Sequence, residues 1–389
     1  MQPSTAGRTH RGSVSCSKSL MPRVFVARLR LRIGRGTSVT WSWLTGPAFV
    51  VNWCRYMNFS AECATEPLAL VHELSVTYLP DSDQPVHALD HACLEIRPGE
   101  LVGILGESGS GKSTLAAALL KLLPTDARYD SGTIHFRGRD LLALPETALR
   151  LIRGAEIALI PQDPALALNP SIRVGDQIAE VLRAHVRMTR RDRRTRVEEL
   201  LAEVGFDQPR QIYRAYPHQL SGGQRQRVVI AQAVACRPKL VIADEATSKL
   251  DASLQAEIIA LMREISQRHR MAFIVISHDP TVLAGFVDRI AVMYAGRIVE
   301  EGRIEDIFRR PLHPYTQALV RLSARYLPDA GTRARFPAIH GEPPVLNSLG
   351  VGCPFAPRCP ERMQVCTERD LEETAPQHSQ RVSCFKYGN

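Results

Sequence analysis

Nine consecutive residues near position 110 have the composition of a phosphate-binding loop. They run from Gly106 to Thr114 as Gly-Glu-Ser-Gly-Ser-Gly-Lys-Ser-Thr, between the apolar run 101–105 and the alanine- and leucine-rich segment 115–123. The order strand, glycine-rich loop, helix is the context that a P-loop requires. Glycines let the backbone wrap closely around an anion, and the start of a helix adds N–H groups and a favourable dipole. The sequence therefore predicts a nucleoside triphosphate site rather than a strand–helix turn without a ligand.

The side chains of this loop divide the chemistry among them. Lys112 can reach the β- and γ-phosphates, and the Ser113 hydroxyl can ligate Mg²⁺. The residues that we expect to contact the nucleotide are glycines, hydroxyl residues and the lysine: Gly106, Ser108, Gly109, Ser110, Gly111, Lys112, Ser113 and Thr114.

Two further segments have residue types suited to anion or metal chemistry. Ser221, Gly222 and Gly223 precede the helical stretch 224–236, which makes a second anion-binding helix start. Asp244 and Glu245 end the apolar strand 240–245. There, one carboxylate can hold Mg²⁺ through water and the other can orient an attacking water. Taken alone, Ser-Gly-Gly is only a helix start, and two acids at a strand end can simply face solvent.

The run Leu220-Ser221-Gly222-Gly223-Gln224 resembles the signature motif of ATP-binding-cassette (ABC) ATPases. With the P-loop it places residues 67–311 in that family, with six motifs in the family's order. The resemblance implies three roles that isolated residues would not: Tyr78 stacks on adenine, Gln162 reaches Mg²⁺ or water, and His278 contacts the γ-phosphate. It also implies that Ser221–Gln224 and Asp251 serve the nucleotide. The segment Ser248–Asp251 departs from the family pattern at Lys249, because family members usually have a small residue at that position.

The predicted fold is α/β, a P-loop NTPase of the ABC type. Strands that alternate with helices and are apolar on both faces predict a parallel sheet covered by helices. The resemblance adds an antiparallel β subdomain, a helical subdomain at about residues 166–222 and a small C-terminal extension, 312–389. Within the helical part, Thr189 is expected to cap a helix that ends at Gly205.

The C-terminal region resembles that of the oligopeptide/dipeptide/nickel importer branch. The match rests on His-Pro-Tyr-Thr-Gln-Ala-Leu at 313–319, Gly-Glu-Pro-Pro at 341–344 and the proline-rich segment 353–360, supported by segments 168–170 and 174–178. Without the family, this region is proline-rich and poor in periodicity. We expect it to be held by contacts or a metal rather than by a core of its own.

Four cysteines gather in this region: Cys353, Cys359, Cys366 and Cys384. Four thiolates can hold a tetrahedral zinc or a [4Fe–4S] cluster, but the spacing lacks the C-x₂-C pairs common at zinc sites. The resemblance adds that some peptide-importer ATPases hold an iron–sulfur cluster there. The alternative to a cluster is four reduced thiols that pack as small apolar groups.

The chain's positive charge is concentrated in one segment. The whole chain has a net charge of +9. Residues 1–61 hold nine basic side chains and no Asp or Glu, and the remaining 328 residues hold equal numbers of basic and acidic side chains. Overall basicity therefore does not indicate a nucleic-acid surface. Residues 1–66 could be a transit peptide, a membrane-surface arm or a signal sequence whose apolar part lies too far from its start. We favour a working chain that starts at Met57, with little stable structure before about residue 67.

The resemblance implies an ATP-hydrolysing, energy-coupling subunit of an importer for peptides, with ATP and Mg²⁺ as its cofactors. The expected partners are a second ABC ATPase chain, identical or related, two transmembrane permease subunits and, indirectly, an extracytoplasmic solute-binding protein. The expected location is the cytoplasmic face of the inner membrane, with no nucleic acid bound. The alternative is a soluble ABC ATPase of DNA repair or translation. One P-loop, no sustained heptads and the importer-type tail favour transport.

Overall fold

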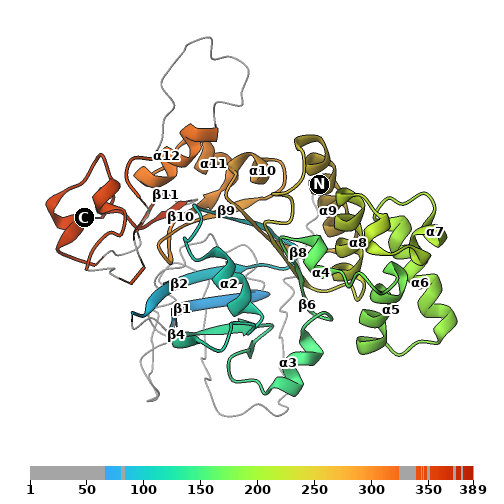
Figure 1. Cartoon of the computed structure of the whole chain (residues 1–389). Helices are drawn as coiled ribbons and strands as arrows, with labels where there is room; N and C mark the ends of the chain where they lie inside the picture. Colours follow the sequence, from blue (N-terminus) through green and yellow to red (C-terminus); the bar gives the residue numbers. More distant parts are fainter. Residues whose placement is uncertain are drawn as a thin grey trace, which may run out of the picture. The chain divides into compact units, whose positions relative to one another are not determined.

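Five parallel strands, largely buried on both faces, form one side of the larger of the two sheets that the described residues make in the computed structural model (Figure 1). The order across the whole sheet is β11-β12-β10-β9-β3-β8-β7-β6. Its parallel strands are β3 (Leu101–Leu105), β6 (Ile157–Ile160), β7 (Leu240–Asp244), β8 (Ala272–Ser277) and β9 (Arg289–Tyr294). Burial of both faces explains the apolar runs in these segments. The predicted parallel sheet is confirmed.

The structure describes residues 66–79, 84–323, 339–342, 344, 346–347, 351–370, 374–377 and 380–388. All of them belong to one compact unit, residues 59–389. The predictions for residues 1–65, including the start at Met57, fall outside the described residues. No helix in the described part of the chain is both long and apolar enough to cross a membrane.

A smaller, antiparallel sheet lies next to the P-loop helix. Its order is β2-β1-β4-β5, with β1 (Ala69–Tyr78), β2 (Val86–Ile96), β4 (Ala127–Phe136) and β5 (Arg139–Asp140). Buried residues of this sheet, such as Leu74 and Ile134, join Leu115 and Leu119 of helix α2 (Lys112–Leu119) and Ile274 of β8 in one apolar cluster. Because this cluster packs α2 against both sheets, it also fixes the position of the P-loop that precedes α2.

Helix α2 begins before the alanine- and leucine-rich segment 115–123 and ends within it. The Leu115 N–H already donates to the Gly111 carbonyl, which places Lys112 in the first turn. The helix ends before Lys121, whose φ of 49° is left-handed. The loop therefore presents Lys112 from the helix itself.

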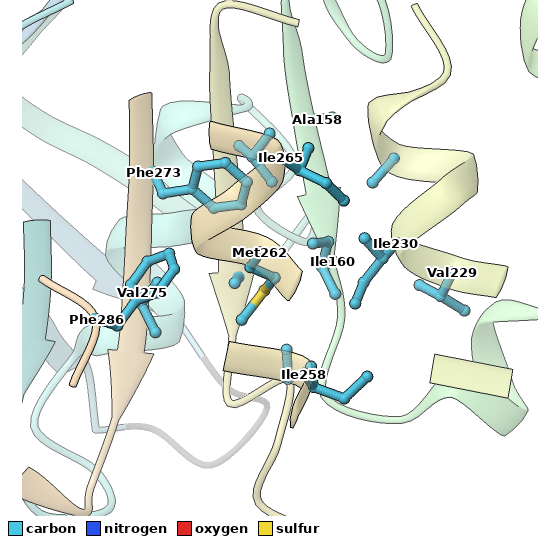
Figure 2. Close-up of a cluster of buried hydrophobic side chains, with 14 of the residues drawn as sticks. Ala158, Ile160, Val229, Ile230, Ile258, Met262, Ile265, Phe273, Val275 and Phe286 are labelled. Carbon is cyan, nitrogen blue, oxygen red and sulfur yellow. The ribbon is translucent and has the colours of Figure 1, made fainter. Parts of the chain in front are cut away.

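Helices cover the other face of the larger sheet. Val229 and Ile230 of α8 (Gly222–Val234) and Ile258, Met262 and Ile265 of α9 (Ala252–His269) pack against it. The α9 residues recur every three to four positions and so share one helix face. Figure 2 shows these side chains converging with Ile160 of β6 and with Phe273 and Val275 of β8.

Three helices form the insert that the sequence predicted near residues 166–222. They pack against one another and are α5 (Val174–His185), α6 (Arg190–Glu203) and α7 (Pro209–Arg214) (Figure 1). Thr189 caps α6 by accepting from the Asp192 N–H, and Gly205 follows it with a φ of 87°. Both predicted helix signals are confirmed. The other α-helices in the described residues before the tail are α3 (Glu146–Ile152), α4 (Pro164–Ala167), α10 (Pro280–Ala284) and α11 (Ile304–Arg309).

The C-terminal region extends the larger sheet. Strand β12 (Gln380–Val382) pairs antiparallel with β10 (Arg297–Arg303), and β11 (Thr374–Gln377) pairs with β12. Helix α12 (Pro314–Ser323) is anchored by buried Glu300, whose carboxylate accepts the N–H groups of Leu312 and His313. This region is therefore held by the main fold, as expected for a segment with little core of its own.

We predict that Ile230→Ala destabilises the protein by about 2–5 kcal/mol, because it leaves a cavity between α8 and β6. Ile230 is 0% exposed. Denaturant unfolding of the purified chain measures the change. Leu166→Ala is the control, since Leu166 is 87% exposed and its truncation should alter stability by less than about 0.5 kcal/mol. Equal effects of the two variants would contradict this packing.

Candidate functional site

The P-loop is held so closely that two of its positions admit only glycine. Gly111 has a φ of 100°, and a Cβ there would lie 2.4 Å from the Ala88 carbonyl oxygen. A Cβ on Gly106 would lie 2.2 Å from the Met293 carbonyl oxygen. Such distances are far below van der Waals contact. The loop between β3 and α2 therefore packs its backbone directly on β2 and β9.

Lys112 points back into the loop. Its side chain is buried, and its Nζ donates to the carbonyls of Gly106 at 2.8 Å and Glu107 at 2.7 Å. Burial lowers the pKa of Lys112, and the nearby Glu245 and Asp244 carboxylates oppose that shift. A cation enclosed by the loop is positioned to meet an anion that the loop binds.

Polar side chains from three parallel strands meet beside the loop. The Ser113 hydroxyl donates to Asp244 Oδ1 at 3.2 Å. Glu245 accepts from Gln162 Nε2 at 2.8 Å and pairs with His278 Nδ1 at 3.1 Å. Asp244, Gln162 and His278 stand at or just after the carboxyl ends of β7, β6 and β8, which share one edge of the sheet because the strands are parallel.

The two acids at the end of β7 differ in environment. Burial raises the pKa of Asp244, and its hydrogen bond with Ser113 opposes the shift. Glu245 has a left-handed φ of 45°, which is strained for a residue with a Cβ. Its N–H donates to the Ile276 carbonyl of β8, so the turn is fixed on the neighbouring strand. Ser113 and Asp244 can together hold a divalent cation, and Glu245 can accept a proton.

Tyr78 lies at the same end of the loop helix. Its hydroxyl is 3.3 Å from the Thr114 hydroxyl oxygen. The end of β1 is thus brought to the start of α2, where a base attached to a bound phosphate could meet the ring. The structure therefore gathers Tyr78, the P-loop, Gln162, Asp244, Glu245 and His278 in one place.

The second glycine motif caps a different helix. Ser221 accepts from the Gln224 N–H at 3.3 Å, and Gln224 accepts from the Ser221 N–H at 3.0 Å, a reciprocal capping box at the start of α8. Asp251 caps α9 by accepting from the Leu254 N–H. Within the described part of the chain, no hydrogen bond or ion pair joins Ser221–Gln224 to the P-loop. This motif is not brought to the P-loop of its own chain.

Lys249, the departure from the family pattern, forms an ion pair with Asp163. Asp163 directly follows Gln162, so the pair links the segments after β6 and β7. Sequence reasoning missed it because the partners are 86 residues apart and local spacing does not show that the two segments meet. Both side chains are partly exposed to solvent, so the pair adds little to stability.

The four C-terminal cysteines line one pocket, together with His313 and Phe355. Burial raises the pKa of the Cys353 thiol to about 11 and also raises those of Cys359 and Cys384. Across the described residues, no group of three or more His, Cys, Asp or Glu side chains is arranged so that it could hold a metal ion. The four cysteines therefore line the same pocket, without the geometry of a single-ion site.

His313 was not singled out from the sequence, and only the pocket reveals it. Burial lowers its pKa to about 3, so the ring is neutral. Its Nδ1 accepts from the Tyr315 N–H, so the ring hydrogen is on Nε2. That buried Nε2 has no partner among the described atoms. A buried donor without a partner is costly, which marks the pocket as a place where an acceptor would be favourable.

Comparison with known families supports the resemblance in two segments. The family described as "ABC transporter" matches residues 89–248, which include the P-loop, Ser221–Gln224 and Asp244. The family described as "Oligopeptide/dipeptide transporter, C-terminal region" matches residues 299–366, which include the first three pocket cysteines.

Curated relatives are similar over most of the chain. The oligopeptide transport ATP-binding protein OppD of Escherichia coli is 43% identical over 335 residues, which is 84% of this chain and 97% of that protein. The dipeptide transport ATP-binding protein DppD of Haemophilus influenzae is 44% identical and covers 77% of this chain and 89% of that protein.

Solved structures share the fold at lower identity. The ATP-binding cassette MJ0796, in a dimeric post-hydrolysis state bound to ADP and Pi, is 28% identical with a TM-score of 0.55, over 61% of this chain and 98% of that chain. The cbiO1 protein of Clostridium perfringens, part of the ABC transporter complex cbiONQ, is 27% identical with a TM-score of 0.56, over 68% of this chain and 97% of that chain.

We predict that Lys112→Ala weakens binding of Mg²⁺–ATP roughly 10- to 100-fold, because it removes the charge enclosed by the loop. Equilibrium titration with a fluorescent ATP analogue measures the affinity. Lys239→Ala is the control, since Lys239 is exposed and also carries one positive charge. An unchanged affinity in the Lys112 variant would mean that the nucleotide binds elsewhere.

Proposed function

Because the chain belongs to the ABC transporter ATPases, in the branch of the oligopeptide and dipeptide transport ATP-binding proteins, we propose that it hydrolyses ATP to drive import of peptides through separate membrane subunits. The observation that carries the proposal is the meeting of Lys112, Ser113–Asp244 and Gln162–Glu245–His278 at one sheet edge. Both reported relatives are transport proteins. They favour transport over the alternative of DNA repair or translation.

The proposed roles follow from the geometry. The P-loop N–H groups and Lys112 would hold the phosphates, Ser113 and Asp244 would hold Mg²⁺, and Gln162 would reach the metal or its water. Glu245 is the general base for the attacking water, and His278 positions it and meets the γ-phosphate. Most of the catalysis is then positioning and charge stabilisation at the phosphates. Tyr78 stacks on the adenine.

The proposed working unit is a head-to-tail pair of cassettes. The separation of Ser221–Gln224 from the P-loop of its own chain supports this arrangement, as does the dimeric state of the related cassette MJ0796. Ser221, Gly222, Gly223 and Gln224 would cover the ATP held by the second ATPase, identical or related, with Asp251 beside them. Closure of the pair would drive two permease subunits, and hydrolysis would reset them.

The remaining assignments extend this proposal. The cassette would comprise residues 67–311, with a helical subdomain at about 166–222, and the tail would comprise 312–389. The chain would act at the cytoplasmic face of the inner membrane, served indirectly by an extracytoplasmic solute-binding protein. The names of the two relatives support peptides as the solute.

We predict that Glu245→Gln keeps ATP binding and lowers hydrolysis at least about 100-fold, because it removes the base and leaves the phosphate cradle. The same change should abolish ATP-dependent peptide uptake in vesicles that hold the complex with its two permeases. Glu264→Gln, at an exposed carboxylate of α9, is the control. Near-parental hydrolysis in the Glu245 variant would remove this residue from catalysis. Co-purification with ribosomes or DNA instead of membrane proteins would overturn the transport proposal.

A group bound by the cysteines is the finer part of the cofactor proposal, beside ATP and Mg²⁺. We propose that Cys353, Cys359, Cys366 and Cys384 hold a [4Fe–4S] cluster. Two observations support it: the four thiols line one pocket, and the unpartnered His313 Nε2 donor lies there too. A cluster is ligated at separate irons, so its cysteines stand farther apart than the ligands of one ion. With raised thiol pKa values, ligation must displace protons.

We predict that anaerobically purified protein contains about four iron atoms and matching sulfide per chain, with little zinc. Iron, sulfide and zinc analysis measures the content, and thermal unfolding measures stability. Cys359→Ser should lose iron and unfold at lower temperature, whereas Cys236→Ser, a partly buried cysteine outside the pocket, should keep the iron. Protein without iron or zinc, together with an equally stable Cys359 variant, would leave the four cysteines as packing residues.

A further inference from the structure

Glu107, the second residue of the P-loop, is held from three directions. Its N–H donates to the Tyr315 hydroxyl at 2.8 Å. Its carboxylate accepts from both terminal nitrogens of Arg358, at 2.7 and 3.2 Å. Its carbonyl accepts from Lys112 Nζ. Two of the three partners come from the C-terminal region, more than 200 residues farther along the chain.

Arg358 is enclosed by polar partners at this contact. Its side chain is 4% exposed. Besides Glu107, its guanidinium donates to the carbonyls of His340 and Ile339 and to the Tyr294 hydroxyl. These five hydrogen bonds use all five N–H groups of the fork. Lysine carries three donors on a single nitrogen and cannot reproduce such a planar, bidentate pairing.

Three aromatic rings support both contacts. Tyr294, Tyr315 and Phe355 are each at most 1% exposed. Their ring centroids are 4.6 Å apart for Tyr294–Tyr315, 5.2 Å for Tyr294–Phe355 and 5.4 Å for Tyr315–Phe355. Packing at these distances fixes the rings. The Tyr315 hydroxyl and Arg358 are therefore held against the P-loop by a rigid aromatic cluster.

The aromatic cluster also forms part of the cysteine pocket. Phe355 lines that pocket with the four cysteines, and Arg358 immediately precedes Cys359. The Cys353 N–H donates to the Cys366 carbonyl at 2.8 Å, which closes the segment that carries Arg358. The segment that brings Arg358 to the P-loop is therefore the one that carries Cys353, Cys359 and Cys366.

We propose that Arg358 and Tyr315 are positioning residues that hold the P-loop in its phosphate-binding shape, so that the C-terminal region sets the affinity for ATP. The inference rests on the proposed ATP site. A loop that is ordered before binding does not have to be ordered by the ligand, and this raises affinity without new contacts to it. Because neither residue reaches the carboxylate that activates water, turnover at saturating ATP should be preserved.

The test compares Arg358→Gln, Arg358→Lys and Tyr315→Phe with the parent full-length chain, using mant-ATP with Mg²⁺ and steady-state hydrolysis. We expect Kd and KM for ATP to rise about 10-fold in Arg358→Gln, with kcat within about two-fold of the parent. Arg358→Lys should resemble Arg358→Gln because it loses the bidentate pairing. Arg362→Gln is the matched control, since Arg362 lies in the same segment and is exposed.

Glu107→Gln tests the same contact from the P-loop side, which keeps the proposal testable if the Arg358 variants do not fold. Its Kd should rise to a similar extent, and the double variant should be no weaker than either single one, as expected for residues that act through one contact. A Kd within about two-fold of the parent in folded Arg358→Gln or in Glu107→Gln would overturn the proposal. Lys112→Ala is measured alongside: if it also binds ATP normally, the ATP site itself is wrong.

Discussion

Parallel pairing of β6, β7 and β8 beside β3 is the constraint on which the rest of this structure depends. Parallel strands end at the same edge, so the residues that follow them are gathered without any local signal in the chain. Gln162, Asp244 and His278 meet the P-loop for this reason. The pairing also demands two covered faces. One is packed by α2 and the small sheet, and the other by α8 and α9.

The tail depends on the same sheet. Strand β12 continues the sheet beyond β10, and Glu300 of β10 holds the start of α12. A region with few apolar residues of its own is thereby fixed to the main core. Its rings Tyr315 and Phe355 pack on Tyr294 of β9, and its Arg358 pairs with Glu107 of the P-loop. The cysteine pocket and the P-loop are thus linked by one packed unit. The tail therefore packs directly against the loop of the proposed nucleotide site.

Much of the site could be predicted from the sequence. The P-loop, the acids at the end of β7 and the second glycine motif each sit in a short run whose spacing carries its own physical meaning. The parallel sheet followed from strands that are apolar on both faces. The bounds of α2 could not be read in the same way, because they depend on the Gly111 carbonyl accepting from Leu115 and on the left-handed φ of Lys121.

The sequence by itself determined which residue types the chain offers for phosphate, metal and proton chemistry, since those depend on neighbours only a few positions away. Only the tertiary structure decided which distant side chains meet them. Gln162 and His278 join Glu245 from 83 and 33 residues away, Lys249 pairs with Asp163 across 86, and Arg358 reaches Glu107 across 251. Such contacts have no periodic signature, because strand order and packing set them, and local spacing carries no information about either.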